Sequence, residues 1–270
     1  MILHTKMKSL LIYLLRLLIY LILIAPLLLF LAYGFSTRWF FPAPLPTEWT
    51  TSNFDRAMND PLTLTGMRDG LLIALTVSLL SLILAFPAAR AMGLRRFRGQ
   101  QLVWLLLFLP TVVPPLAIGM GLNILFLQIG LAGTIVGVVL AHLVPTLPYT
   151  IFTLSSAFTR YDENYEYQAL ALGAGPVQIF LNVTLRLMTP SLVVATLFAF
   201  LISWSQYLLT LLIGGGRIIT LPILLFAAAS GGNPATIGIK SLLFVLPPVL
   251  VIAFTARELN RHGNAIREQY

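Results

Sequence analysis

Cysteine is absent from this 270-residue sequence, and charged residues make up only 10% of it. The lack of cysteine excludes disulfide bonds, thiolate metal sites and cysteine nucleophiles. The scarcity of charge matters as much, because a water-soluble domain carries about 25% charged residues. With 58% hydrophobic residues and a mean hydropathy of +0.91, the chain cannot cover itself with a polar surface. We therefore expect an α-helical membrane protein.

Other absences narrow the function. A phosphate-binding P-loop needs Gly-x-x-x-x-Gly-Lys-Ser/Thr, and no lysine of this chain stands in such a frame. The three histidines, His4, His142 and His262, are too scattered to predict a metal site. We expect no catalytic residue, no metal and no cofactor bound by this chain. The net charge of +8 does not indicate nucleic acid, because the basic residues fall in short segments between apolar blocks.

Six apolar blocks are long enough to cross a bilayer, which takes about 20 residues per helix. The first is preceded by Lys6 and Lys8 and is longer than the apolar part of a signal peptide, so we expect it to be a retained helix. The chain is predicted to form a single all-α transmembrane domain over 1–270, with helices at about 10–33, 70–91, 102–126, 131–158, 190–213 and 237–256.

The distribution of lysine and arginine predicts the orientation, because cytoplasmic segments of membrane proteins carry the excess of basic residues. Six spans with the N-terminus inside place twelve of the 17 basic residues inside and five outside. The outside residues are then Arg38, Arg56, Arg68, Arg217 and Lys240. Both termini and the segment 159–189 are therefore predicted to be cytoplasmic.

Prolines interrupt the third and fourth blocks, at Pro110, Pro114, Pro115, Pro145 and Pro148. Membrane helices tolerate proline where a neighbouring group or water satisfies the freed carbonyl. Bent helices could also line a pathway that has to open. Proline alone does not distinguish these interpretations.

The semi-polar segment 159–189 follows the fourth block. Acidic residues near its start suit a helix N-terminus. Gly173 and Gly175 can end that helix, and Pro176 can open the next at its first turn. The sequence predicts two short helices joined by a glycine elbow at the inner face of the membrane.

This segment resembles the EAA loop of the membrane subunits of binding-protein-dependent ABC importers. That loop reads Glu-Ala-Ala, three residues, Gly, nine residues, Ile, one residue, Leu-Pro. Gly173 stands at the glycine position, Ala169 at the second alanine, and Val183 and Leu185 at the later apolar positions. The chain departs from the pattern with Tyr167 in place of the glutamate, beside Glu166, with Gln168 in place of the first alanine and with Arg186 in place of the proline.

Two further stretches, 41–50 and 109–122, resemble the subgroup that serves polyamines, ferric iron and phosphonates, and the resemblance extends over about 40–270. It implies the type I six-helix importer fold in a bacterial inner membrane. It also implies a partner ATPase dimer that holds ATP and Mg, a second homologous or identical permease subunit, and a periplasmic or lipid-anchored solute-binding protein. The residues it implies for ATPase coupling are Glu166, Tyr167, Ala169, Gly173, Ala174, Gly175 and Pro176. An ordinary interfacial amphipathic segment is the alternative for 159–189.

Polar side chains within apolar blocks are costly in a bilayer and mark candidate pathway residues. These candidates are Asn123, His142, Ser203, Trp204, Ser205, Gln206 and Tyr207. The serines could instead bond to their own helix carbonyls, and His142 could be a hydrogen-bonded packing residue. No acidic residue lies deep in a block, so we do not expect a proton relay.

The predicted function is translocation of a small polar or charged solute, with polyamine as the leading substrate class. The alternatives are an ion-gradient-driven secondary transporter and a membrane assembly protein. A secondary transporter usually shows repeated halves and membrane-embedded charges, and the sequence shows neither.

Overall fold

The computed structural model describes residues 2–37, 39, 43 and 45–267. Regular secondary structure in these residues is helical, apart from an isolated bridge between Ser36 and Trp49. By its contacts the chain forms two compact units, one of 1–64 with 224–246 and one of 65–223 with 247–270. The single transmembrane domain stays a prediction. Of the 41–50 stretch, Phe41, Pro42 and Pro44 lie outside the described residues, as does Arg38.

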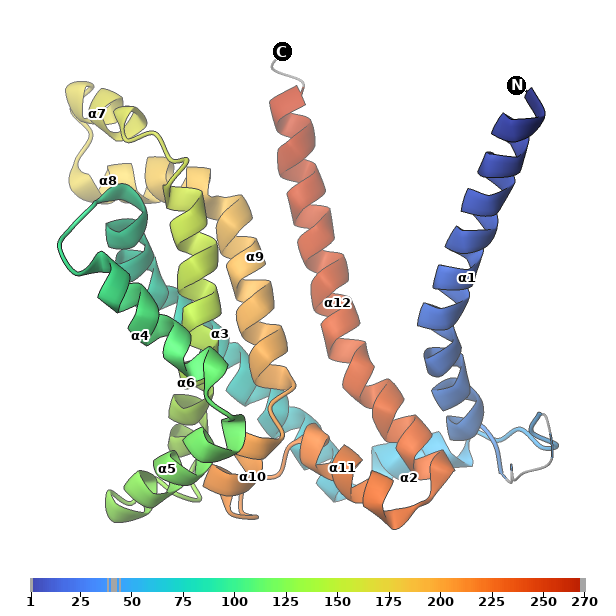
Figure 1. Ribbon diagram of the computed structural model, residues 1–270. Helices are drawn as coiled ribbons and strands as arrows, with labels where there is room; N and C mark the ends of the chain where they lie inside the picture. The colour runs from blue at the N-terminus through green and yellow to red at the C-terminus, as the bar shows by residue number, and fades with distance from the viewer. Residues whose placement is uncertain (1, 38, 40–42, 44, 268–270) are drawn as a thin grey trace. The chain divides into compact units, whose positions relative to one another are not determined.

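Figure 1 shows the helices in chain order. They are α1 (Ile2–Gly34), α2 (Ser52–Asn59), α3 (Pro61–Leu94), α4 (Gln100–Val112), α5 (Pro115–Gln128), α6 (Ile135–Phe158), α7 (Asn164–Ala171), α8 (Pro176–Ile179), the π-helix η1 (Phe180–Thr184), α9 (Leu185–Trp204), α10 (Leu208–Gly214), α11 (Leu221–Gly231) and α12 (Pro234–Arg267).

Five helical stretches in the described part of the chain are long and apolar enough to cross a membrane. The bent pair of α4 and α5 makes a sixth if it counts as one span. The five stretches are Ile12–Gly34, Pro61–Leu94, Ile135–Phe158, Pro176–Trp204 and Pro234–Arg257.

The third predicted helix, 102–126, is not one straight helix. The axes of α4 and α5 differ by 100° across Val113 and Pro114. Pro115 opens α5 at its first position, and neither proline has an N–H to continue the hydrogen bonds of α4. The Pro114-Pro115 pair therefore ends one helix and starts the next.

The fifth predicted helix, 190–213, differs at both ends. It begins earlier, as α9 at Leu185, and α9 ends at Trp204. The polar residues 205–207 interrupt the helix, and α10 follows from Leu208. Side-chain hydrogen bonds near this break, described below, connect the end of α9 to α10.

Other boundaries shift by a few turns. α3 begins at Pro61 rather than at 70 because Asp60 caps it, accepting the N–H of Leu62 and the hydroxyl of Thr63. The predicted outer loop 214–234 contains α11, a short apolar helix.

In the first unit, α1 meets the start of α12 through small residues. A Cβ on Gly238 would lie 2.6 Å from the backbone nitrogen of Gly34, so the two backbones touch directly. The amide of Asn53, on α2, donates to the carbonyls of Gly34 and Ser36 at 3.1 and 2.9 Å. α2 is thus fixed to the end of α1.

In the second unit, α6 is the central helix, and its most extensive packing is against α9. Apolar side chains gather around it in two buried clusters, one toward each end. The first holds Ile73, Val77, Phe126, Val138, Val139, Ala141, Leu143 and Ile213, and the second holds Ala85, Ala89, Met92, Ile151, Leu154, Phe158, Met188 and Ala195.

Candidate coupling site

The candidate site lies where α6 ends and α7 begins. The carboxylate of Asp162 accepts the backbone N–H of Asn164 at 3.0 Å, which satisfies one free donor at the start of α7. Glu163 and Glu166 stand in the same turn. Negative side chains there also match the positive end of the helix dipole.

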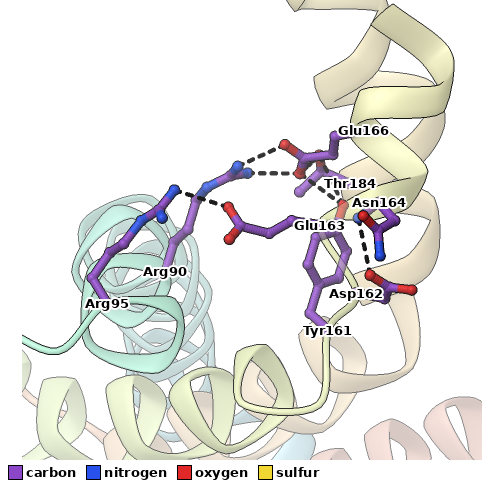
Figure 2. Close-up of polar contacts among 8 residues, drawn as sticks. All are labelled: Arg90, Arg95, Tyr161, Asp162, Glu163, Asn164, Glu166 and Thr184. Atoms are coloured by element: carbon purple, nitrogen blue, oxygen red, sulfur yellow. Dashed lines mark hydrogen bonds and ion pairs between the residues drawn. The ribbon is translucent and has the colours of Figure 1, made fainter. Parts of the chain in front are cut away.

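Glu166 is the centre of a polar network (Figure 2). Arg90, near the end of α3, donates to both carboxylate oxygens of Glu166, at 3.0 and 2.7 Å. The hydroxyls of Tyr161 and Thr184 each donate to Oε1 of Glu166 at 2.7 Å. One carboxylate thus joins α3, the α6–α7 link, α7 and η1.

The network holds Glu166 in its charged form. Burial raises the pKa of the Glu166 carboxyl, but the hydrogen bonds from Arg90, Tyr161 and Thr184 lower it more, to about 2. Burial raises the pKa of the Tyr161 phenol to about 12, so it remains a hydrogen-bond donor at neutral pH. The ion pair between Arg90 and Glu166 is therefore complete across the physiological pH range.

A second ion pair lies beside the first. Arg95 contacts Glu163 at 3.0 Å, and both arginines point from the end of α3 toward α7 (Figure 2). The Arg95 side chain is 66% exposed, and exposed pairs contribute about 0–1 kcal/mol. Arg90 and Glu166 are the main connection.

Gly173 forms the elbow after α7. The N–H groups of Gly173 and Ala174 donate to the carbonyls of Leu170 and Ala169 at 2.9 and 3.0 Å, which is the Schellman arrangement. Gly173 has φ +85°, and a Cβ there would meet no atom within 4 Å. Glycine is therefore favoured here by the backbone conformation and not by a lack of room for a side chain.

The chain then re-enters a helix at Pro176. The side chain of Gln178 accepts the N–H of Gly175 at 3.0 Å, which fixes the start of α8. α8 and η1 lie transverse to α9 and turn into it at the end of η1 (Figure 1). The wider π turn ends at Thr184, whose hydroxyl reaches Glu166.

Apolar side chains are exposed around the elbow. Tyr167, Leu170, Leu172 and Val177 are 58–88% exposed. Beside them, α7, α8 and the end of α3 enclose a hollow of about 300 Å³ that reaches Arg90 and Glu166. A partner side chain of moderate size would fit this hollow.

The residues that the sequence singles out in this segment take different places. Glu166 lies inside the network, whereas Tyr167 is 59% exposed and lines the hollow beside it. Gly173 makes the turn, Pro176 opens α8, and three small residues, Ala169, Ala174 and Gly175, are half-buried. Sequence reasoning missed Arg90, because it assigned basic residues only to membrane topology, and it missed Tyr161 and Thr184, because the loop pattern does not include them.

The pathway candidates divide into two groups. His142 is 1% exposed, and its ring nitrogens lie 2.9 Å from the hydroxyls of Ser203 and Thr210. These contacts connect the end of α9 to α10 across the break. The Thr210 hydroxyl also lies 2.9 Å from the carbonyl of Gln206, to which it can donate. The ring of Trp204 is buried against Phe200.

The other candidates lie outside this buried cluster. Asn123, Gln206 and Tyr207 are half-buried, and Ser205 is exposed with its hydroxyl bonded to the carbonyl of Ile202. No hydrogen bond among the described residues joins Asn123 to His142. In that same part of the chain, no group of three or more His, Asp or Glu side chains could hold a metal ion.

Residues 81–261 match the family model described as "Binding-protein-dependent transport system inner membrane component". The match covers the candidate site from Arg90 to Thr184. The chain belongs to this family. It is a permease subunit of a binding-protein-dependent ABC importer, and the family prediction from the sequence is confirmed.

The curated relatives are all permease proteins, but the solutes in their names differ. The chain is 33% identical to the inner membrane ABC transporter permease protein YnjC of Escherichia coli over 158 aligned residues. The aligned region covers 58% of this chain and 31% of YnjC. The chain is 27% identical over 244 residues to a putative 2-aminoethylphosphonate permease, PhnV, of Salmonella paratyphi A, covering 88% and 89% of the two chains. It is 26% identical to the putrescine permease PotI of E. coli, covering 86% and 84%.

The fold also matches a solved structure. A bacterial ABC transporter involved in the import of the acidic polysaccharide alginate aligns with a TM-score of 0.74 at 18% identity, covering 93% of this chain and 96% of that one. This likeness confirms the predicted all-α importer permease fold.

Proposed function

We propose that this subunit is driven by a separate ATPase dimer, which binds ATP and Mg and engages the segment 159–189. The observation that carries the proposal is the connection of α7 to α3 and η1 through Glu166. A short helix held at both sides by charged hydrogen bonds can pass a rigid displacement to two spanning helices. A flexible loop would absorb that displacement.

The exposed apolar side chains at the elbow support docking of a soluble partner there. Tyr167, Leu170 and Leu172 lie between the candidate spans that end at Phe158 and begin at Pro176, and Val177 lies at the very start of the second span. Apolar surface of this kind marks an interaction site in many proteins. In this proposal the segment faces the cytoplasm, as do both termini, and the spanning helices face lipid or a second permease subunit of the same family.

The proposed substrate is a small polar or charged solute of the polyamine kind, delivered by a periplasmic or lipid-anchored binding protein. Similarity to PotI supports this class, and similarity to PhnV supports aminophosphonates about equally. Uptake of radiolabelled putrescine and of 2-aminoethylphosphonate, measured in the same strain with and without the gene, decides between them. No observation favours a secondary transporter or an assembly protein.

Coupling is tested by the variant Gly173→Asp. The introduced side chain would sit on a backbone with φ +85° and would place a negative charge at the docking surface. We expect the variant chain to stay in the membrane and to lose stimulation of the partner ATPase by the loaded binding protein. Gly175→Ala is the matched control, because Gly175 has an ordinary φ of −74° and open surroundings. Full stimulation in Gly173→Asp would refute the proposal.

A further inference from the structure

A hollow in the second unit lies between α6 and α9, at the α6 end and the α9 start that are nearest α7. It has a volume of about 720 Å³. Thr153, Ser156 and Arg160 line it from α6 and the turn that follows, and Ser191 and Val194 line it from α9. The hollow is open and distinct from the smaller one beside Glu166.

One face of α6 carries polar side chains, of which Thr153 and Ser156 line this hollow and Tyr149 lies one turn beyond it. Tyr149, Thr153 and Ser156 follow one another at helical spacing, so they share a face of α6, and Arg160 follows in the turn after the helix. Tyr149, Ser156 and Arg160 are exposed, and Thr153 is half-buried. We call these four residues the α6 polar face. Thr153 donates to the carbonyl of Tyr149 at 2.8 Å, so its hydroxyl oxygen keeps lone pairs that can accept a hydrogen bond.

Exposed faces of neighbouring helices have a different character. On α3 the exposed side chains at similar depth are Ile83 and Leu84, and on α4 they are Leu105, Leu106 and Leu109. Such faces suit lipid. Polar side chains inside spanning helices generally face the protein interior or water, so the α6 polar face is not a lipid-facing surface.

The depth of this face follows from helix geometry. Tyr149 precedes the end of α6 at Phe158 by nine residues, which corresponds to about 13 Å at 1.5 Å per residue. The polar face therefore extends from the membrane surface to near the middle of a hydrocarbon layer of about 30 Å.

We propose that the groove between α6 and α9 forms the inner half of the solute path, with the α6 polar face in contact with the solute. This inference rests on the proposed function. The α6 side of the groove offers hydroxyl donors and acceptors, and the α9 side is mostly apolar (Leu187, Met188, Pro190 and Val194), so the groove suits a small solute with both hydrogen-bonding groups and apolar parts. The face holds no carboxylate, and Arg160 and Asp162 at its mouth have opposite charge. Selection by charge therefore falls to other parts of the importer.

Tyr161 connects the groove to the coupling site. Its side chain lines the hollow, and its hydroxyl donates to Glu166 at 2.7 Å. A displacement of α7 therefore moves a wall of the groove. This contact gives a direct route from the ATPase-facing segment to the width of the solute path.

The absence of cysteine from the sequence makes a labelling experiment direct. Tyr149→Cys and Thr153→Cys place a thiol on the α6 polar face, and Leu84→Cys and Leu106→Cys place one at similar depth on apolar faces. Each variant is placed in phospholipid nanodiscs and treated with a thiol-reactive methanethiosulfonate that carries a negatively charged sulfonate group. We expect the first two to react more than about tenfold faster, because a charged reagent is strongly excluded from hydrocarbon.

Equal slow reaction of all four cysteines would overturn the inference, since the face would then be covered by lipid or by a second subunit.

A second experiment measures uptake. The variant Thr153→Trp fills the groove, and Thr153→Ser and Leu106→Trp are its controls. We expect more than about a tenfold loss of uptake only in Thr153→Trp, with the partner ATPase still bound, and unchanged uptake would count against the solute path. Loss of ATPase binding by the unmodified chain would instead reject the proposed function.

Discussion

Arg90 and Glu166 form a two-point ion pair between the end of α3 and the first turn of α7, with N–O distances of 3.0 and 2.7 Å. Their side chains are 33% and 17% exposed, so solvent screens the pair only in part. The segment that carries the family's loop pattern is therefore fixed to a spanning helix by charge and not only by covalent connection.

The strength of this pair can be measured by a double-mutant cycle. Arg90→Ala and Glu166→Ala each remove charge-assisted hydrogen bonds, and each is expected to lower the free energy of unfolding by about 1–3 kcal/mol. Because the residues contact each other, the double mutant should fall short of additivity by about 0.5–3 kcal/mol. Unfolding in detergent with increasing denaturant gives the four values.

The pair of Arg95 and Glu163 is the matched control for this cycle. Arg95 directly follows α3 and Glu163 directly precedes α7, so this pair joins the same two helix ends, but Arg95 is 66% exposed. Its cycle is expected to give a coupling energy of about 0–1 kcal/mol. A coupling energy as large as that of the first pair would mean that burial is not what strengthens Arg90 and Glu166.

Acid is expected to loosen the coupling site only well below physiological pH. The pKa of Glu166 is lowered from 4.5 to about 2, so its contribution to stability is complete above pH 4.5 and is lost as the pH falls toward 2. Glu166→Gln should therefore be less stable than the wild type at pH 7, and the difference should shrink between pH 4.5 and 2. Thermal unfolding across this range measures it. A difference that already disappears near pH 6 would contradict the assigned network.

Much of this arrangement follows from the sequence. The apolar blocks predict the spanning helices, and Gly173 with Pro176 predicts the elbow. The Arg90 contact could not be predicted, because 76 residues separate it from Glu166, and the register of α3 against α7 depends on packing. The break at 205–207 was also missed, since hydropathy does not register a side chain from another helix, such as His142, that bonds to side chains on both sides of the break.

Substitutions at Gly173 test whether the backbone conformation, rather than a lack of room for a side chain, requires glycine there. Its φ of +85° is unfavourable for side chains, yet a Cβ would contact nothing. Gly173→Ala should cost about 1–2 kcal/mol of stability, and Gly173→Asn should cost less, because asparagine adopts this conformation more readily. Thermal unfolding of the two variants tests the order. If alanine and asparagine are equally tolerated, the turn at 173 does not depend on positive φ.

Gly93 gives the opposite case. A Cβ there would lie 2.5 Å from Cβ of Phe158 and 2.8 Å from the carbonyl oxygen of Ser155, so α3 and α6 would have to separate. Gly93→Ala should destabilise the chain by about 1–3 kcal/mol through overpacking. Substitution by serine should be no milder, which differs from the graded response expected at Gly173.

His142 tests whether the buried cluster at the α9–α10 break is structural. Replacing His142 with alanine removes two side-chain hydrogen bonds and leaves a buried cavity, so we expect a loss of about 2–4 kcal/mol in stability. Ser203→Ala should cost less, because it removes one contact and the smaller side chain. If the role is structural, uptake per folded molecule and the solute concentration for half-maximal uptake should be unchanged in Ser203→Ala. A raised half-maximal concentration with normal stability would instead place this cluster in contact with the solute.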